Sequence, residues 1–411
     1  MLTFGYLSDK LGRKFGMMSA TGIVAVFSGL AAASSGAHHS LQGMLNMLSA
    51  CRFLLGIGIG AEYPCGSVAA SEQSEGEGIS KNAQHRWFVL STNSMLDCGF
   101  VMSNFAPLVL LWIFGNDHLR AVWRLSLGLG VVPALVVFIW RLKMDEPLHY
   151  KLNSMTRSKV PYWLIIKRYW VPLSGISLSW FLYDFIVYPF KLYASTVVDN
   201  ITHNDDSLIA VLGWNVVISL FYVPGTVIGA FIVDYISGLL AQAVIGFIMS
   251  GLYTHLTNHI AAFTVVYGIF LSLGELGPGN CVALFAAKTG PTAVRGQFYG
   301  LAAAIGKVGA FVGTWAFPPM IEAFGGPTTA RGNTGPFWVA SGLAVLNAIV
   351  VFSTVKPLDH DGMLKEDAAF RQYLEQNGYD TSQMGILSDS DTESVESAAA
   401  VIREEVLDEK E

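Results

Sequence analysis

An indole, a carboxylate and a phenol follow one another along one side of a predicted helix in the second half of the chain. Trp180, Asp184 and Tyr188 are spaced four residues apart, so they lie in line on one helix face, and Lys191 continues the stripe with an ammonium. A cation beside hydrogen-bond donors can bind an anion, and a buried carboxylate can take up a proton. The stripe therefore predicts a site for an anionic solute.

A second polar face is predicted in the first half of the chain. Arg52, Gly56 and Tyr63 share one side of a helix, and the carboxylates of Glu62 and Asp97 lie within apolar stretches. A charge at the centre of a bilayer costs at least about 2.5–3.5 kcal/mol. Such side chains should therefore face a cavity or a protein partner and not lipid.

The elements that carry these residues are apolar enough to span a membrane. Of the 411 residues, 52% are hydrophobic and only 14% are charged, which excludes an ordinary soluble enzyme. The net charge of −6 gives no nucleic-acid signature, and the four cysteines have no metal-ligand spacing. We expect an all-α polytopic membrane protein without cofactor or metal. Its ten expected spans, of roughly 20 residues each, are Phe15–Gly36, Met44–Pro64, Phe88–Phe114, Trp123–Leu142, Trp170–Ala194, Leu208–Tyr235, Leu239–His255, Ala262–Ala287, Tyr299–Ala323 and Phe337–Thr354.

Lysine and arginine residues are dense in every second connection between these spans. The connections around residues 10–14 and 81–86 are basic, whereas those between them carry few positive charges. The positive-inside rule places the basic connections and both termini in the cytoplasm. Asn200, two residues before Thr202, then faces the outside, where a glycan can be attached.

The chain divides into two groups of spans and a polar tail. Residues 144–169 form the most basic connection, which predicts a cytoplasmic central loop between an incomplete bundle at 1–143 and a six-helix bundle at 170–356. The acidic, serine-rich tail at 357–411 cannot bury a core, so we expect disorder there, with a short helix near Asp367–Gln376.

One short stretch near the start of the chain matches the pattern G-x-x-x-D-[RK]-x-G-x-[RK]-[RK] at every specified position. Its glycines allow a tight turn, its carboxylate can cap a helix N-terminus, and its cations suit an anionic membrane face. The matching residues are Gly5, Asp9, Lys10, Gly12, Arg13 and Lys14. The pattern resembles the signature between the second and third helices of the major facilitator superfamily. The resemblance implies two six-helix bundles, with helix 1 and most of helix 2 missing here.

Further segments resemble the fungal proton-coupled phosphate symporters and, more closely, the glycerophosphoinositol (glycerophosphodiester) permeases. These segments are "GIGIGAEYP", "WFLYDFIVYP", "GPGN" and "GKVGA". Glu62 stands where the phosphate symporters have an aspartate, and "GPGN" has an extra glycine, and both departures favour the permeases with their bulkier substrate. The resemblance implies a substrate site at the bilayer midplane, with the matched residues Tyr63, Trp180, Asp184, Tyr188, Asn280 and Lys307.

The chemistry of a phosphodiester suggests a role for each group. Its single negative charge needs a buried cation, for which Lys307 and Arg52 come first and Lys191 third. The phenols, the indole and the Asn280 amide can orient the phosphoryl oxygens and the polyol. Proton coupling needs a carboxylate in low-dielectric surroundings. Asp184 is the first choice for this carboxylate, and Asp97 and Glu62 follow. Arg52 is the basic residue assigned to the same proton-coupling set.

Most of these residues also have a structural interpretation. Arg52 can pair with a carboxylate across the bundle, and Glu62 can cap or pair near the membrane face. Asp97 can bond to helix neighbours, Lys191 can snorkel to the outer interface, and Glu275 can belong to a structural pair at a helix end.

The residues and the resemblance together predict a secondary transporter and not an enzyme. We expect it to import an anionic glycerophosphodiester, such as glycerophosphoinositol, together with protons by alternating access. The expected partners are this phosphate-containing solute, protons and the lipid bilayer, without nucleic acid, and we expect a monomer in the plasma membrane. An inorganic phosphate:proton symporter is the nearest alternative. A non-transporting nutrient receptor, or an inactive truncated paralogue, is the alternative of another class.

Overall fold

A computed structural model of the chain describes residues 1–385 except 77, 194–206, 234–238, 257–259, 328, 356–357 and 359. Within these residues every regular element is helical. The first part contains α1 (Leu2–Leu11), α2 (Arg13–Ala32), α3 (Leu41–Glu62), the π-helical turn η2 (Tyr63–Ser67), α4 (Val68–Ser74), α5 (Gln84–Ser91), α6 (Asn93–Phe114), α7 (Leu119–Gly128), α8 (Val131–Leu142) and α9 (Leu148–Asn153).

The second part begins with the longest helix and ends with a helix beyond the last predicted span. Its elements are α10 (Tyr162–Leu192), α12 (Leu208–Leu220), α13 (Tyr222–Ile232), α14 (Leu239–Leu256), α15 (Ile260–Gly274), the π-helical turn η5 (Glu275–Gly279), α16 (Asn280–Thr289), α17 (Arg295–Ala323), α18 (Ala330–Thr354) and α19 (Gly362–Gln376).

The predicted all-α membrane architecture is confirmed. In the described part of the chain, 9 helical segments are long and apolar enough to cross a membrane. The predicted span Leu239–His255 coincides with α14, whose apolar described stretch, Gln242–Leu252, is shorter. The predicted central loop is too long, because α10 already begins at Tyr162, directly after Pro161. Proline is well suited to the start of a helix because it has no N–H to leave unpaired.

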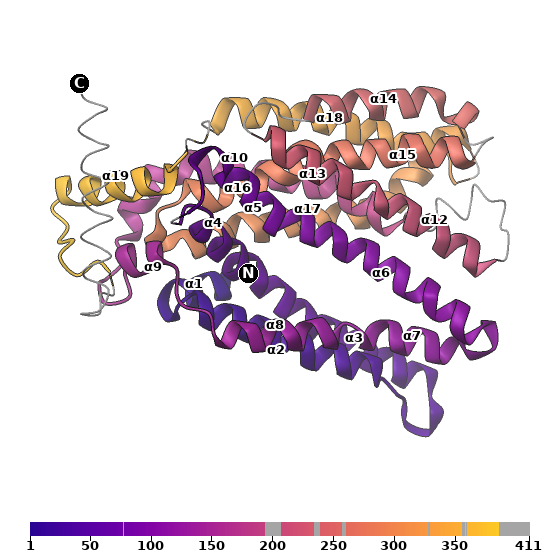
Figure 1. Cartoon of the computed structure of the whole chain (residues 1–411). Coiled ribbons are helices and arrows are strands. Elements are labelled where there is room, and N and C mark those ends of the chain that lie inside the picture. Colours follow the sequence, from indigo (N-terminus) through magenta and orange to yellow (C-terminus); the bar gives the residue numbers. More distant parts are fainter. Residues whose placement is uncertain are drawn as a thin grey trace.

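The helices form two groups that touch along two seams (Figure 1). In the first group α2 packs on α3 and α8, and in the second α10 packs along α17 and α18. One seam joins α6 to α12 and α13, and the other joins α1 and η2 to α17. Residues on the facing sides of α6, α1 and η2 therefore contact the opposite group.

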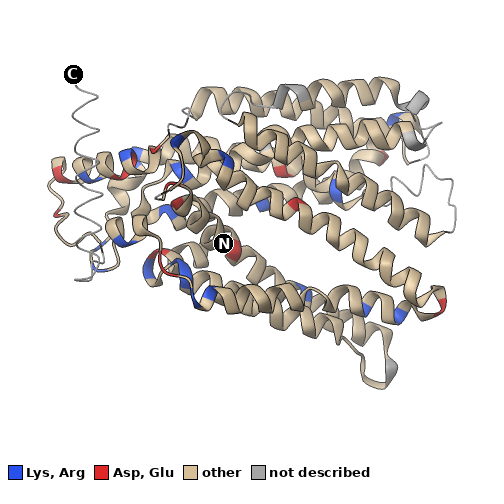
Figure 2. Cartoon of the chain, in the orientation of Figure 1, with Lys and Arg blue, Asp and Glu red and all other residues tan. Residues whose placement is uncertain are grey.

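The charged side chains are unevenly distributed along the long axis of the molecule. Figure 2 shows lysine and arginine gathered at the end that carries α9 and α19, with few charges along the spans. Both connections that the sequence marks as basic, around residues 10–14 and 81–86, belong to this end. We call it the basic end.

The predicted tail at 357–411 contains the helix α19, which begins at Gly362, before the expected helix near Asp367–Gln376. Met363, Phe370 and Leu374 lie on one face of this helix and are fully buried against the bundles. This spacing gives the helix an apolar stripe, which the acidic composition of the tail as a whole conceals. The short helix expected near Asp367–Gln376 is thus confirmed, while residues 386–411 lie outside the described residues.

Candidate functional site

Lys307 of α17 is the centre of a buried polar cluster in the second helix group. Its ammonium donates hydrogen bonds to Asp184 Oδ2 at 2.9 Å and to the Tyr188 hydroxyl at 2.6 Å. The same Nζ lies 4.8 Å from the ring centre of Tyr63 and 4.3 Å from that of Tyr188. The Asp184 side chain is 2% exposed and that of Lys307 26%. The cation therefore stays reachable while its carboxylate partner is covered.

Close packing of α10 on α17 holds this cluster in place. Trp180 packs edge-on against Tyr299 at 5.3 Å between ring centres and lies 6.3 Å from the Tyr63 ring. A Cβ atom on Gly306 would come within 2.5 Å of the Trp180 indole, and one on Gly309 within 2.2 Å of the Phe181 carbonyl oxygen. Only glycine allows this approach, so the "GKVGA" segment fixes the distance between Lys307 and α10.

The structure thus brings together five of the six residues predicted to bind substrate: Tyr63, Trp180, Asp184, Tyr188 and Lys307. An ammonium beside two phenols is a suitable partner for an oxyanion, because its charge attracts the anion and the hydroxyls can donate hydrogen bonds. The paired Asp184 carboxylate keeps the cluster neutral until an anion arrives. The ring of Tyr63 lies against the cation, as its predicted place in the substrate site requires.

Asn280, the sixth predicted residue, lies elsewhere. It is fully buried, donates to the Thr226 carbonyl oxygen at 3.1 Å, and accepts from Asn93 at 3.2 Å. These contacts place it on the seam between α6 and α13, away from Lys307.

Arg52 and Glu62 also lie outside the Lys307 cluster. Arg52 is exposed on α3, and its guanidinium forms no hydrogen bond or ion pair with any described residue. Glu62 forms a two-point ion pair with Arg141 of α8, in which Nη1 lies 2.8 Å from Oε2. The geometry therefore agrees with the structural interpretation of Glu62.

A second buried cluster contains Asp97, Lys191 and Glu275. Lys191 donates to Glu275 at 2.8 Å, so it does not snorkel to the interface, and Asp97 accepts a hydrogen bond from the Thr226 hydroxyl. Asp97 belongs to the first helix group and the other residues to the second. The sequence did not predict that these side chains meet.

The opening motif joins the two groups at the basic end. Asp9 accepts hydrogen bonds from the backbone N–H groups of Gly296 and Gln297, both at 2.9 Å. These N–H groups belong to the first turn of α17, where an anion is favoured by the unpaired donors and the helix dipole. A Cβ on Gly5 would come within 2.4 Å of the Gly296 carbonyl oxygen, so the motif glycine permits the contact.

Arg13 connects this contact to a larger charge network. It is fully buried, with Nη1 at 2.5 Å from Asp9 and Nη2 at 2.9 Å from Glu72. Glu72 also pairs with Arg295 of α17 at 3.2 Å, and Lys288 pairs with Glu75 at 2.7 Å. Each of the last two pairs joins the first helix group to the second. Sequence reasoning missed these carboxylates, although "SEQSEGE" marks an acidic stretch directly after an apolar span.

The remaining motif residues anchor the central loop. Gly12 has φ +108°, a left-handed conformation that favours glycine, and this allows Glu146 to accept from the backbone N–H groups of Arg13 and Lys14 at 2.9 and 3.1 Å. Lys10 donates to the Met155 carbonyl oxygen at 3.2 Å.

The docked helix α19 bridges the same end. Asp367 accepts from the Thr292 N–H at 2.7 Å and from its hydroxyl at 2.5 Å, and Glu366 pairs with Arg168 at 3.0 Å. Asp361, just before the helix, pairs with Lys81 of the first group at 2.9 Å. The chain after α18 therefore contacts both groups.

Because His149 at the basic end is buried, we expect the stability of the protein to depend on pH. Burial lowers the pKa of His149, which lies in α9 outside the spans, and within the described chain its Nδ1 has no hydrogen-bond partner. Below about pH 6.5 the histidine of the unfolded chain binds a proton, whereas the buried His149 of the folded chain stays neutral to lower pH. More protons on the unfolded state mean that the free energy of unfolding falls as the pH falls. On acidification, the melting temperature of the detergent-solubilised His149→Gln variant should therefore fall less than that of wild type. The two melting temperatures should converge at low pH.

The exposed His118 provides the control for this prediction. His118→Gln should follow the wild-type pH curve. Equal loss of melting temperature on acidification in wild type and His149→Gln would contradict the prediction.

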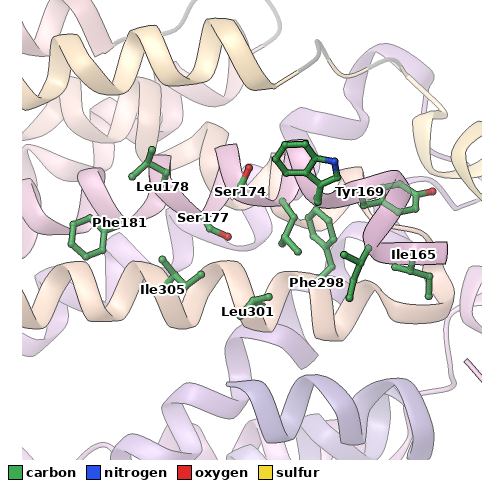
Figure 3. Close-up of a pocket in the computed structure, with 12 residues that line it drawn as sticks. Ile165, Tyr169, Ser174, Ser177, Leu178, Phe181, Phe298, Leu301 and Ile305 are labelled. Atoms are coloured by element: carbon green, nitrogen blue, oxygen red, sulfur yellow. The ribbon is translucent and has the colours of Figure 1, made fainter. Parts of the chain in front are cut away.

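A large groove of the structure lies apart from these polar clusters. It measures about 610 Å³, lies between α10 and α17, and is lined by apolar residues such as Leu173, Phe298 and Ile305 (Figure 3). Its few hydroxyls, those of Ser174, Ser177 and Tyr169, give it little to bind an anion with. The groove therefore does not replace the Lys307 cluster as the candidate site.

The predicted glycosylation site and the question of a metal site remain. Asn200, the predicted glycosylation site, lies outside the described residues. Among the residues that are described, no group of three or more histidine, cysteine, aspartate or glutamate side chains is arranged to hold a metal ion.

Comparisons with known proteins show the family and the fold of the chain. A family model described as Major Facilitator Superfamily matches residues 1–314. The glycerophosphocholine permease GIT4 of Candida albicans is 46% identical over 93% of this chain and 73% of its own length, and the major glycerophosphoinositol permease GIT3 of the same organism is 42% identical over the same shares. The solved structure of the proton:xylose symporter XylE aligns with a TM-score of 0.72 at 16% identity, over 88% of this chain and 85% of that one, which shows a shared fold. The chain therefore belongs to the major facilitator superfamily, and within it to the family of the fungal glycerophosphodiester permeases.

Proposed function

We propose that this transporter is a proton-coupled symporter that imports an anionic glycerophosphodiester, such as glycerophosphoinositol, by alternating access. The observation that carries the proposal is the Lys307 cluster, in which one reachable ammonium stands beside the Tyr63 and Tyr188 phenols and a covered Asp184. The relatives named above support the choice of a phosphodiester.

In this proposal the substrate phosphate takes over part of the pairing of Lys307. The single negative charge of the diester approaches Nζ, and the phenols of Tyr63 and Tyr188 donate hydrogen bonds to its oxygens. Trp180 closes one side through its indole, which packs on Tyr299. The alcohol head group extends beyond this shell, which leaves room for substrates that differ in that group.

The charge network at the basic end fits the role of a gate. Asp9 holds the start of α17, and the pairs Glu72–Arg295 and Glu75–Lys288 join the two groups at the same end. We propose that these contacts close the cytoplasmic side, and that they separate when the bundles rock to release substrate. The positive-inside rule supports this orientation, with both termini in the cytoplasm. The proposal further takes the transporter to be a monomer in the plasma membrane.

Competition between substrates separates this proposal from an inorganic phosphate symporter. Cells that lack their own glycerophosphodiester uptake are given labelled glycerophosphoinositol at acidic external pH, with and without excess inorganic phosphate. Uptake that persists in excess phosphate supports the diester permease. Uptake that phosphate abolishes favours the phosphate symporter, and binding without any uptake favours a receptor.

A further inference from the structure

The second buried cluster crosses the seam between the two helix groups. Asp97 lies on α6 of the first group, whereas Lys191 lies on α10, Thr226 on α13 and Glu275 on η5 of the second. Lys191 and Asp184 are both on α10, seven residues or about 10 Å apart along the helix. The cluster is therefore a close neighbour of the Lys307 cluster and yet distinct from it.

Lys191 is the cation of this cluster, and it forms an ion pair with Glu275. Its Nζ lies 2.8 Å from Glu275 Oε1, and the aromatic rings of Phe100 and Tyr222 cover it at 4.7 and 4.4 Å. Tyr183 donates a further hydrogen bond to the same Glu275 oxygen at 3.1 Å. Glu275 and Lys191 thus form a satisfied ion pair, which leaves no full countercharge for Asp97.

Asp97 is fully buried and only half satisfied. Its Oδ2 contacts the Thr226 hydroxyl, while Oδ1 accepts no hydrogen bond from any described residue. The charged groups near enough to act on Asp97 are Glu275 and Lys191, and the titratable phenols that face it are Tyr183 of α10 and Tyr222 of α13. With both carboxylates ionised the cluster carries a net negative charge, which is costly to bury without a partner.

The Thr226 hydroxyl indicates how that charge is removed. Its oxygen contacts both the Asp97 carboxyl and the carbonyl oxygen of Tyr222, the latter at 3.2 Å. A hydroxyl has one proton to donate, so it cannot serve two acceptors in full. A proton on Asp97 satisfies both contacts, because Asp97 then donates to Thr226, which donates to Tyr222.

The position of Asp97 distinguishes it from Asp184. Asp184 and Lys307 lie on α10 and α17 of the same group, so rocking of one group against the other leaves their ion pair intact. The contact between Asp97 and Thr226 joins different groups, and the same motion breaks it. The motion therefore breaks a direct contact of the Asp97 carboxyl, whereas it leaves the direct ion pair of Asp184 in place.

We propose that Asp97, facing Glu275 and Lys191 across the seam, is a proton-binding site of this transporter. The site takes one proton per cycle while the seam is open to the outside and releases it on the cytoplasmic side. The inference rests on the proposed proton symport, and it assigns to Asp97 the role that the sequence suggested first for Asp184.

Asp97→Asn in proteoliposomes tests the assignment. Because asparagine resembles the protonated carboxyl, the variant should exchange labelled against unlabelled glycerophosphoinositol at a rate comparable with wild type, but should not accumulate it in response to a proton gradient. Asp117→Asn, at an exposed carboxylate of the same helix group, should behave as wild type in both assays. If Asp97→Asn accumulates substrate in response to the gradient, the assignment of Asp97 is overturned and the proton symport is not. If wild type exchanges substrate but never accumulates it, the proton symport itself is overturned.

Lys191→Met provides a second readout that does not depend on Asp97→Asn folding. Removing a nearby cation favours the protonated form of the carboxyl pair, so the pH midpoint of exchange or uptake should move to higher pH by about one unit or more. A structural ion pair would change the amount of folded protein and leave the midpoint in place. An unchanged midpoint in active Lys191→Met overturns the proposal.

Discussion

Lys307→Met is expected to lower the uptake of labelled glycerophosphoinositol about a hundredfold. Truncating one partner of a buried, hydrogen-bonded charge pair between protein and ligand costs about 2–5 kcal/mol of binding free energy, and every 1.4 kcal/mol is roughly a factor of ten in affinity. In this variant Asp184, whose side chain is 2% exposed, loses its partner at 2.9 Å, and the substrate loses its cation. Initial uptake rates, normalised to the amount of transporter at the cell surface, measure the effect.

Two variants separate loss of binding from loss of folding. Asp184→Asn combined with Lys307→Met removes the whole pair, so the double variant should recover its folded amount but not its uptake. Lys167→Met removes an exposed lysine of α10 and should leave uptake unchanged. Uptake by Lys307→Met within a few-fold of wild type would contradict the assigned site.

Arg13→Gln is expected to cause the largest loss of stability among substitutions in the opening motif. The guanidinium is fully buried between Asp9 and Glu72, and it also donates to the Thr292 carbonyl oxygen at 3.2 Å. Its removal leaves two buried carboxylates with incomplete partners, at a cost of about 3–5 kcal/mol. A fall in the melting temperature of the purified protein measures this loss.

The adjacent Lys14 is the matched control, because it belongs to the same motif and is only half-buried. Its backbone N–H donates a hydrogen bond to Glu146, and a substitution of the side chain preserves this contact. Lys14→Gln should therefore change the stability by no more than about 0.5 kcal/mol. Equal losses in Arg13→Gln and Lys14→Gln would show that net positive charge at this end matters, and not the buried network.

Local patterns in the sequence were sufficient to predict the spans and much of the Lys307 cluster. Four-residue spacing aligned Trp180, Asp184 and Tyr188 on α10, as the structure shows. The partnership with Lys307 came from the resemblance, since no local pattern joins residues 184 and 307. The long apolar stretches likewise predicted membrane spans, because length and hydropathy alone define them.

What the sequence could not predict are contacts between residues that are distant along the chain. Glu72 meets Arg295, and Asp97 meets Thr226, only because the two helix groups face each other. Asn280 was placed at the substrate site by its motif, whereas the extra glycine in "GPGN" belongs to the π-helical turn η5, directly before α16 begins at Asn280. The apolar stripe of α19 was likewise hidden by an acidic composition averaged over the tail.

The most direct test of the whole account is the transport of glycerophosphoinositol by purified protein in proteoliposomes with an imposed inward proton gradient and no other energy source. The account predicts that labelled glycerophosphoinositol accumulates above its outside concentration, and that a protonophore, which dissipates the gradient, abolishes the accumulation. Uptake that only equilibrates the label, or accumulation of inorganic phosphate without glycerophosphoinositol, would contradict it.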